Sequence, residues 1–317
     1  MGEELVLYRP DLYAEKKVFS RIGFSLFLLA ALSLVLQIAI FSVIGLAYPA
    51  MIIQTWFVIL ISLLSMYLIA APCTLSILRG IPSTPIEKRG IGAGRFFKVF
   101  CVCISIMIAG GLIGSVLSEA FGIILNTQPE NAVAELVIET PFLPNLILLV
   151  AIVPIAEEYI FRKVLIEKII KYGEGVAVLL SALFFALVHG NFYQFFYAFG
   201  LGAVFAYVYI KTGRLRYPVI LHMIINFIGS VITPELTNMA GSGELAGIII
   251  FGLYNYALLG AAISGIVFFF LDKNKISLEK GVCALPKGKR FSTIWLNAGI
   301  MVYTISCIAF FVISIIG

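Results

Sequence analysis

Residues 156–162 read Ala-Glu-Glu-Tyr-Ile-Phe-Arg (AEEYIFR), and they lie within a long apolar stretch of a 317-residue chain. Three ionisable side chains, Glu157, Glu158 and Arg162, therefore fall where a membrane-spanning helix is expected. Each charge at the centre of a bilayer costs about 2.5–3.5 kcal/mol on insertion scales. Because charges at this depth are typical of functional sites, the stretch predicts a buried polar site within a membrane.

The composition of the whole chain supports this interpretation. The chain is 61% hydrophobic and 12% charged, with a mean hydropathy of +1.07. Soluble domains carry about 25% charged residues, so we predict an all-α polytopic membrane protein, a multi-pass protein of the cell membrane. The net charge of +5 is small and dispersed, which argues against a nucleic-acid partner. The five cysteines are scattered and match neither zinc-ligand spacing nor a disulfide framework.

Nine apolar runs approach or exceed the length needed to cross a bilayer, so about 8–9 transmembrane helices are expected. They cover residues 22–48, 51–78, 96–125, 142–163, 175–190, 193–211, 216–233, 246–271 and 293–316. Residues 5–20 are predicted to form an amphipathic interfacial helix. The organisation expected is an N-terminal flank (1–140), a core that carries the polar motifs (141–233) and a C-terminal flank (234–317).

Loop charges indicate the topology. From the second loop onward, basic connections alternate with connections that lack basic residues. The basic ones are 79–95, 163–171, 211–216 and 273–290, and the others are 119–139, 190–194 and 235–244. The positive-inside rule then predicts a cytoplasmic N-terminus and an external C-terminus.

Helical spacing places the side chains of the two glutamates on different faces of the helix. Glu158 and Arg162 are four residues apart and share a helix face, so we expect them to form an ion pair. Glu157 is rotated by about 100° from Glu158 and cannot use the same partner as easily. It is therefore expected to be the free carboxylate, which suits a general base.

The only two histidines of the chain also lie in apolar segments. His189 and Glu157 are each 16 residues from Gly173, so two antiparallel helices that turn there would bring them to the same height around a water. His222 and Asn226 share a helix face and could stabilise an oxyanion. For all four side chains to meet, the hairpin around Gly173 must extend about 12 Å beyond the turn at residues 211–216. The site would then be a polar intramembrane cavity, open toward the cytoplasm.

Taken together, these motifs resemble a known family. Glu157-Glu158-x-x-x-Arg162, Phe185-x-x-x-His189 and His222-x-x-x-Asn226 are similar, in this order, to the three motifs of the CAAX-protease and bacteriocin-processing (Abi) family, which includes the eukaryotic prenyl-protein endopeptidase. The resemblance covers roughly residues 140–233. It implies a glutamic-type intramembrane endopeptidase without a cofactor, acting on a peptide or membrane-protein substrate.

The resemblance also implies a role for each motif residue. Glu157 and His189 would activate water, and His222 and Asn226 would form the oxyanion hole. Arg162 would organise the glutamates, while Phe185 would pack beside the site. Prenyl-cysteine specificity is not carried over from the eukaryotic relative.

Alternatives to the peptidase remain open at this point. Glu158 and Arg162 could simply lock helices together, and His222 could make an ordinary interhelical hydrogen bond. Two histidines and a glutamate are also a catalytic zinc ligand set, although they lie here on separate segments. A non-catalytic scaffold or bacteriocin-immunity protein of the same fold is the main alternative function. A proton-coupled transporter is disfavoured because no internal repeat is visible. The sequence does not give the oligomeric state.

Overall fold

The computed structural model describes residues 11–316, and these contain eight helical stretches long and apolar enough to cross a membrane. They are Leu12–Ala47 (α1), Thr55–Leu78 (α3, η1 and α4), Ala93–Leu125 (α5), Phe142–Tyr172 (α7 to η4), Phe192–Thr212 (α11), Arg216–Gly241 (α12, η5 and α13), Leu245–Lys275 (α14 and η6) and Ala298–Ile316 (α16). The remaining predicted span, 175–190, corresponds to the short apolar helix α10 (Glu174–Leu187). The all-α polytopic prediction is confirmed.

Three expected span boundaries are wrong: the span predicted to end at 163 continues to Tyr172, the span predicted to end at 233 continues to Gly241, and the first span starts early. The first span was expected to start at residue 22 after a separate interfacial helix, but α1 is continuous from Leu12. No proline interrupts residues 12–47, and the buried Glu15 is compensated within the protein because it accepts a hydrogen bond from Lys171 at 3.0 Å. Residues 5–10 of the predicted interfacial helix lie outside the described residues.

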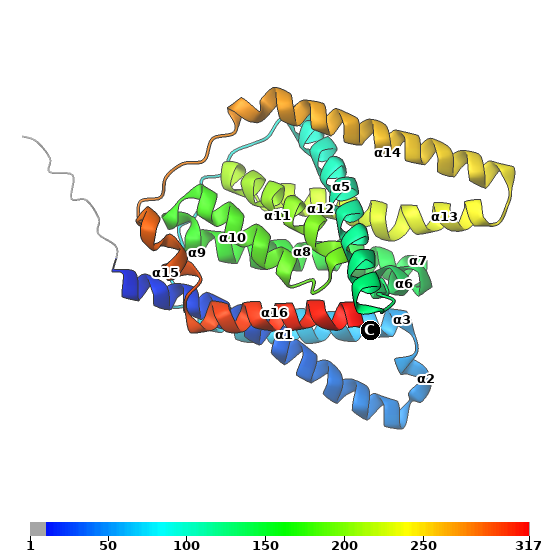
Figure 1. The fold of residues 1–317 in the computed structure, drawn as a ribbon, viewed down its shortest axis with the longest axis horizontal. Helices are drawn as coiled ribbons and strands as arrows, with labels where there is room; N and C mark the ends of the chain where they lie inside the picture. Colours follow the sequence, from blue (N-terminus) through cyan, green and yellow to red (C-terminus); the bar gives the residue numbers. More distant parts are fainter. Residues whose placement is uncertain (1–10, 317) are drawn as a thin grey trace, which may run out of the picture.

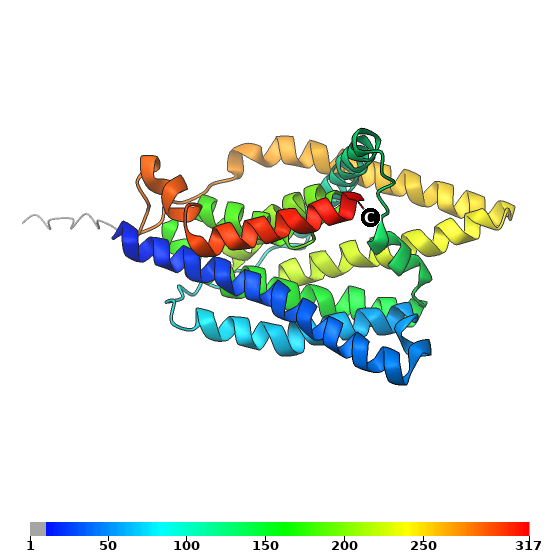
Figure 2. The ribbon, with the colours of Figure 1, turned by 60° about the horizontal axis from the view of Figure 1, so that its bottom comes forward.

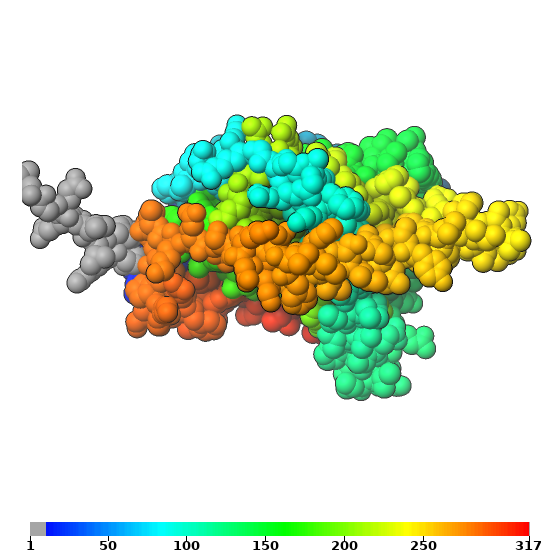
Figure 3. Space-filling view, turned by 90° about the horizontal axis from the view of Figure 1, so that it is seen from above, coloured from blue at the N-terminus to red at the C-terminus, as the bar shows by residue number. Residues whose placement is uncertain are grey.

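The helices that carry the motifs occupy the middle of the molecule. Figure 1 shows α8, α10, α11 and α12 between α1 and α16 on one side and α14 on the other. In the turned view of Figure 2, α1 and α16 again run side by side, in agreement with their many contacts. Figure 3 shows α14 lying along the upper face, with α5 emerging on both sides of it. The flanking helices thus lie on both sides of the helices that carry the motifs.

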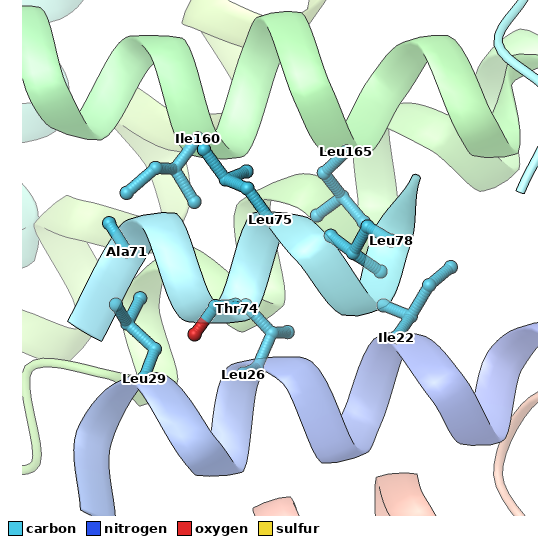
Figure 4. A pocket seen from close by; sticks show the side chains of 9 residues that line it. All are labelled: Ile22, Leu26, Leu29, Ala71, Thr74, Leu75, Leu78, Ile160 and Leu165. Carbon is cyan, nitrogen blue, oxygen red and sulfur yellow. The ribbon is translucent and has the colours of Figure 1, made fainter. Parts of the chain in front are cut away.

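The N-terminal flank packs directly on the core. Helix α4 (Ala71–Leu78) lies between α1 and the segment that carries the glutamates. The side chains at this junction, shown in Figure 4, are apolar except for Thr74: Ile22, Leu26, Leu29, Ala71, Leu75, Leu78, Ile160 and Leu165. This apolar contact fixes the flank relative to the glutamate helix.

The basic connections gather at one end of the molecule, as the charge alternation predicts. Backbone hydrogen bonds tie them together, from Thr84 N–H to the Glu167 carbonyl (2.7 Å), from Arg89 N–H to the Thr212 carbonyl (2.7 Å) and from Cys283 N–H to the Lys171 carbonyl (2.8 Å). Figure 1 shows these connections at the end where α1 begins. The side of the membrane to which this end belongs stays a prediction.

The expected offset between the two turns at this end is not observed. Lys211 forms an ion pair with Glu174 at 2.6 Å, so the turn after α11 lies beside the hairpin turn at Gly173. Counting helical rise gave an offset of about 12 Å because it treats the segments as straight, parallel α-helices. The stretch from Tyr159 to Tyr172 instead contains the π-helical η3 (Tyr159–Val164) and the 3₁₀ turn η4 (Ile170–Tyr172).

Prolines explain three of the four π-helical segments among the described residues. The segments η1 (Leu64–Ala70), η2 (Asn145–Ile152) and η5 (Ile228–Ile232) each end two residues before Pro72, Pro154 or Pro234. Proline within a helix has no N–H to donate, so the preceding turn widens locally. Such widened turns are tolerated in a membrane where neighbouring helices satisfy the freed carbonyls.

Candidate functional site

The ion pair predicted from helical spacing is present in the core. Glu158 is the last residue of α8 (Val153–Glu158) and Arg162 lies in η3, and Glu158 Oε2 is 2.9 Å from Arg162 Nε. Both side chains have an exposed fraction of 0%. A charge buried this completely needs a partner, and each of these two supplies one for the other.

His222 lies between both glutamates. On α12 (Arg216–Phe227), its Nδ1 is 3.0 Å from Glu158 Oε1 and its Nε2 is 3.7 Å from Glu157 Oε2. A carboxylate only accepts hydrogen bonds, so Nδ1 carries the proton. The neutral ring then presents the Nε2 lone pair toward Glu157, whereas an imidazolium presents a second N–H there.

Two phenylalanine rings frame these charged groups. The Phe185 ring contacts the rings of His222 (5.8 Å between centroids) and His189 (4.9 Å) edge-on, and the guanidinium of Arg162 lies 4.5 Å from its centroid. Phe205 on α11 stacks on His222 at 5.4 Å. Cation–π contacts of this kind are worth about 0.5–2 kcal/mol. Phe185 thus packs beside the site as predicted, while nothing in the sequence distinguishes Phe205 from the other aromatic residues of its span.

His189 follows α10 directly and is fixed through its Nδ1. This nitrogen is 2.7 Å from the carbonyl oxygen of Phe185, in the last turn of the helix. Because the carbonyl can only accept, Nδ1 donates and the Nε2 of the neutral ring is an acceptor. His189 lies within electrostatic range of Glu157 but makes no direct hydrogen bond with it among the described residues. The imidazole nearest to Glu157 is that of His222, while the predicted pairing of Glu157 and His189 through a water stays a prediction.

Asn226 compensates for a proline. In η2, Val153 donates to the carbonyl of Leu148, five residues earlier, so the Leu149 carbonyl would need the N–H of residue 154. That residue is Pro154, which has no N–H. The Asn226 side chain fills this need, with its Nδ2 at 2.9 Å from the Leu149 oxygen. One amide N–H of Asn226 is thus used structurally, and the second makes no hydrogen bond within residues 11–316.

The sequence reasoning missed one contributor to the site. The hydroxyl of Tyr67, in η1, donates a hydrogen bond of 3.2 Å to Glu157 Oε1. Glu157 was expected to be a free carboxylate. Instead, Tyr67 holds one of its oxygens, and the other oxygen faces His222. The only available signal was a tyrosine in an otherwise apolar run, which is common in membrane helices.

Two carboxylates and two imidazoles gather at this point of the core. Among residues 11–316, no three His, Cys, Asp or Glu side chains are arranged to hold a metal ion. Glu157 lacks an Arg or Lys partner in the described part of the chain, and its side chain keeps an exposed fraction of 14%. It is thus the more accessible of two carboxylates beside two imidazoles, which is the composition of an acid–base site.

Comparisons with known proteins agree with the motifs. Residues 139–228 match the family model described as Type II CAAX prenyl endopeptidase Rce1-like. The membrane-embedded CAAX protease MroQ of Staphylococcus aureus is 33% identical over 141 residues, which are 42% of this chain and 55% of that protein. The putative membrane peptidase YdiL of Bacillus subtilis is 28% identical over 157 residues, 48% of this chain and 63% of that protein.

These similarities confirm the resemblance to the CAAX-protease family. They also support a multi-pass membrane protein. The chain spans little more than half the length of the curated relatives that it matches. No solved structure matches it significantly.

Proposed function

We propose that this protein is an intramembrane endopeptidase of the glutamic type. The observation that carries the proposal is the arrangement of two adjacent glutamates, the buried Glu158 and the partly exposed Glu157, around one histidine. Glu158 is neutralised by Arg162, while the polar partners of Glu157 within residues 11–316 are the neutral hydroxyl of Tyr67 and the ring of His222. One carboxylate is therefore structural and the other is left to take a proton.

In the proposed mechanism, a water molecule is bound between Glu157 and the Nε2 of His189. Glu157 takes a proton from this water as its oxygen attacks the carbonyl carbon of the scissile peptide bond. The resulting oxyanion accepts hydrogen bonds from the second amide N–H of Asn226 and from Nε2–H of His222 in its protonated form. Glu157 then returns the proton to the departing amine, and the C–N bond breaks.

The substrate is proposed to be a peptide or membrane protein whose scissile bond reaches the membrane-embedded site. The matched family model and the MroQ relative are described as CAAX proteases, which makes a C-terminal Cys-aliphatic-aliphatic-X peptide the first probe to use. Paired probes with and without an S-farnesyl group separate prenyl dependence from general peptidase activity.

The test uses the full chain reconstituted in liposomes with these internally quenched peptides. Glu157→Gln should lower the cleavage rate by about 10²–10⁴-fold, the usual contribution of a general base. Glu235→Gln is the matched control, since the same substitution falls on an exposed residue at the far end of α12–α13. Cleavage by Glu157→Gln at the rate of the unchanged chain would refute the mechanism and favour a scaffold or immunity function.

A further inference from the structure

Tyr67 lies outside the part of the chain that carries the motifs. It belongs to η1 in the Thr55–Leu78 span, whereas the family model matches residues 139–228. Its ring is partly buried against the main apolar core, and its hydroxyl reaches Glu157 Oε1 at 3.2 Å. A residue of the N-terminal flank thus contacts the proposed base directly.

This hydrogen bond is the only one that Glu157 receives within residues 11–316. Glu158, by contrast, is held by Arg162 and by His222. A glutamate side chain has three rotatable bonds, so a carboxylate without a fixed donor can turn away from its productive position. The Tyr67 hydroxyl fixes Oε1, which directs Oε2 toward His222 Nε2 at 3.7 Å.

The local structure presents Tyr67 rigidly. The π-helical turn that holds it ends two residues before Pro72, and α1 packs along that turn. The apolar contact of α4 with Ile160 and Leu165 fixes the same span against the glutamate segment. The distance between η1 and α8 is therefore set by packing and not by the hydrogen bond itself.

We propose that Tyr67 is a positioning residue for Glu157, so that the N-terminal flank completes the active site. The inference rests on the proposed function, because it assigns Tyr67 a role only through Glu157. Tyr67→Phe keeps the ring and removes the hydroxyl. A hydrogen bond to a charged group corresponds to about a tenfold change in rate, so kcat should fall about tenfold. KM should stay within about twofold, since the hydroxyl contacts the base and not the substrate.

Tyr209→Phe provides the matched control. Tyr209 is also buried, and its hydroxyl donates to Glu167 Oε1 at 2.8 Å, so the variant also removes a tyrosine–glutamate hydrogen bond. That bond joins α11 to α9 (Leu165–Ile169) and involves neither Glu157 nor His222, so kcat should remain close to that of the unchanged chain. Both kcat values are measured on the farnesylated quenched peptide in liposomes.

A second measurement does not depend on activity. In detergent, the Tm loss of the double variant Tyr67→Phe/Glu157→Gln should be smaller than the sum of the two single losses, because both substitutions alter one contact. Additive losses would overturn the contact, and an unchanged kcat in Tyr67→Phe would overturn the positioning role. Full activity of Glu157→Gln would instead refute the proposed function, while the Tm cycle would still report on the hydrogen bond.

Discussion

Replacing Arg162 with methionine should destabilise the protein more than any single change at an exposed charge. The guanidinium is fully buried, its Nε lies 2.9 Å from Glu158 Oε2, and it lies against the rings of Phe185 and Phe205. Methionine is an apolar residue with a long, flexible side chain, so the variant chiefly removes the charge. It leaves the Glu158 carboxylate buried with His222 as its remaining partner.

The expected magnitude follows from this burial. Breaking a buried ion pair by removing one partner costs about 3–5 kcal/mol, because the other charge is left uncompensated. His222 still donates to Glu158, which argues for the lower end, so we expect a loss of about 3 kcal/mol in the free energy of unfolding. Hydrogen bonds between membrane helices contribute on average only about 0.6 kcal/mol to stability. A loss of that size in Arg162→Met would mean that the pair behaves as an ordinary polar contact.

The assay is unfolding in mixed micelles of increasing SDS content. Lys163→Met is the matched control, since Lys163 also pairs with a glutamate four residues on, but its side chain is 44% exposed. Lys163→Met should lower the free energy of unfolding by at most about 1 kcal/mol. The double variant Glu158→Gln/Arg162→Met should recover most of the stability, because the introduced glutamine is neutral and its side-chain oxygen can still accept from His222. A double variant no more stable than Arg162→Met alone would refute the argument from the unpaired charge.

Two further predictions concern packing and metals. Gly114 on α5 approaches α11 so closely that a Cβ atom would lie 2.2 Å from the Phe192 carbonyl oxygen, so Gly114→Ala should cost about 1–3 kcal/mol in the same unfolding assay. Gly111→Ala, where no atom lies within 4 Å of the added Cβ, should be neutral or slightly stabilising, and equal effects at both positions would contradict the α5–α11 contact. Incubation with EDTA should leave peptide cleavage unchanged, because the mechanism uses only side chains. A loss of cleavage that zinc restores would establish the metal-dependent alternative instead.

The sequence alone determined the features that depend on short stretches of chain. Apolar length predicted most ends of the membrane spans closely, because spanning a bilayer is a property of each segment by itself. The exceptions are the start of α1 and the ends of the spans at Tyr172 and Gly241. The Glu158–Arg162 pair could also be predicted, since side chains four residues apart lie on one face of a helix. The motif order also gave the family resemblance, which the matched residues 139–228 confirm.

Only the tertiary structure decided which groups meet across helices. His222 contacts Glu158 from 64 residues away, and Tyr67 reaches Glu157 across 90 residues. Counting residues from Gly173 predicted a water between Glu157 and His189, but it could not predict the direct contacts of Glu157 with His222 and Tyr67, because that count considers two straight, parallel helices alone. Prolines and π-helical turns shift and rotate the real segments, and the packing of the flanks sets their separations. The prediction that Glu157 is the free carboxylate used only the residue spacing along one helix. Its actual neighbours lie on other helices, which only folding brings beside it.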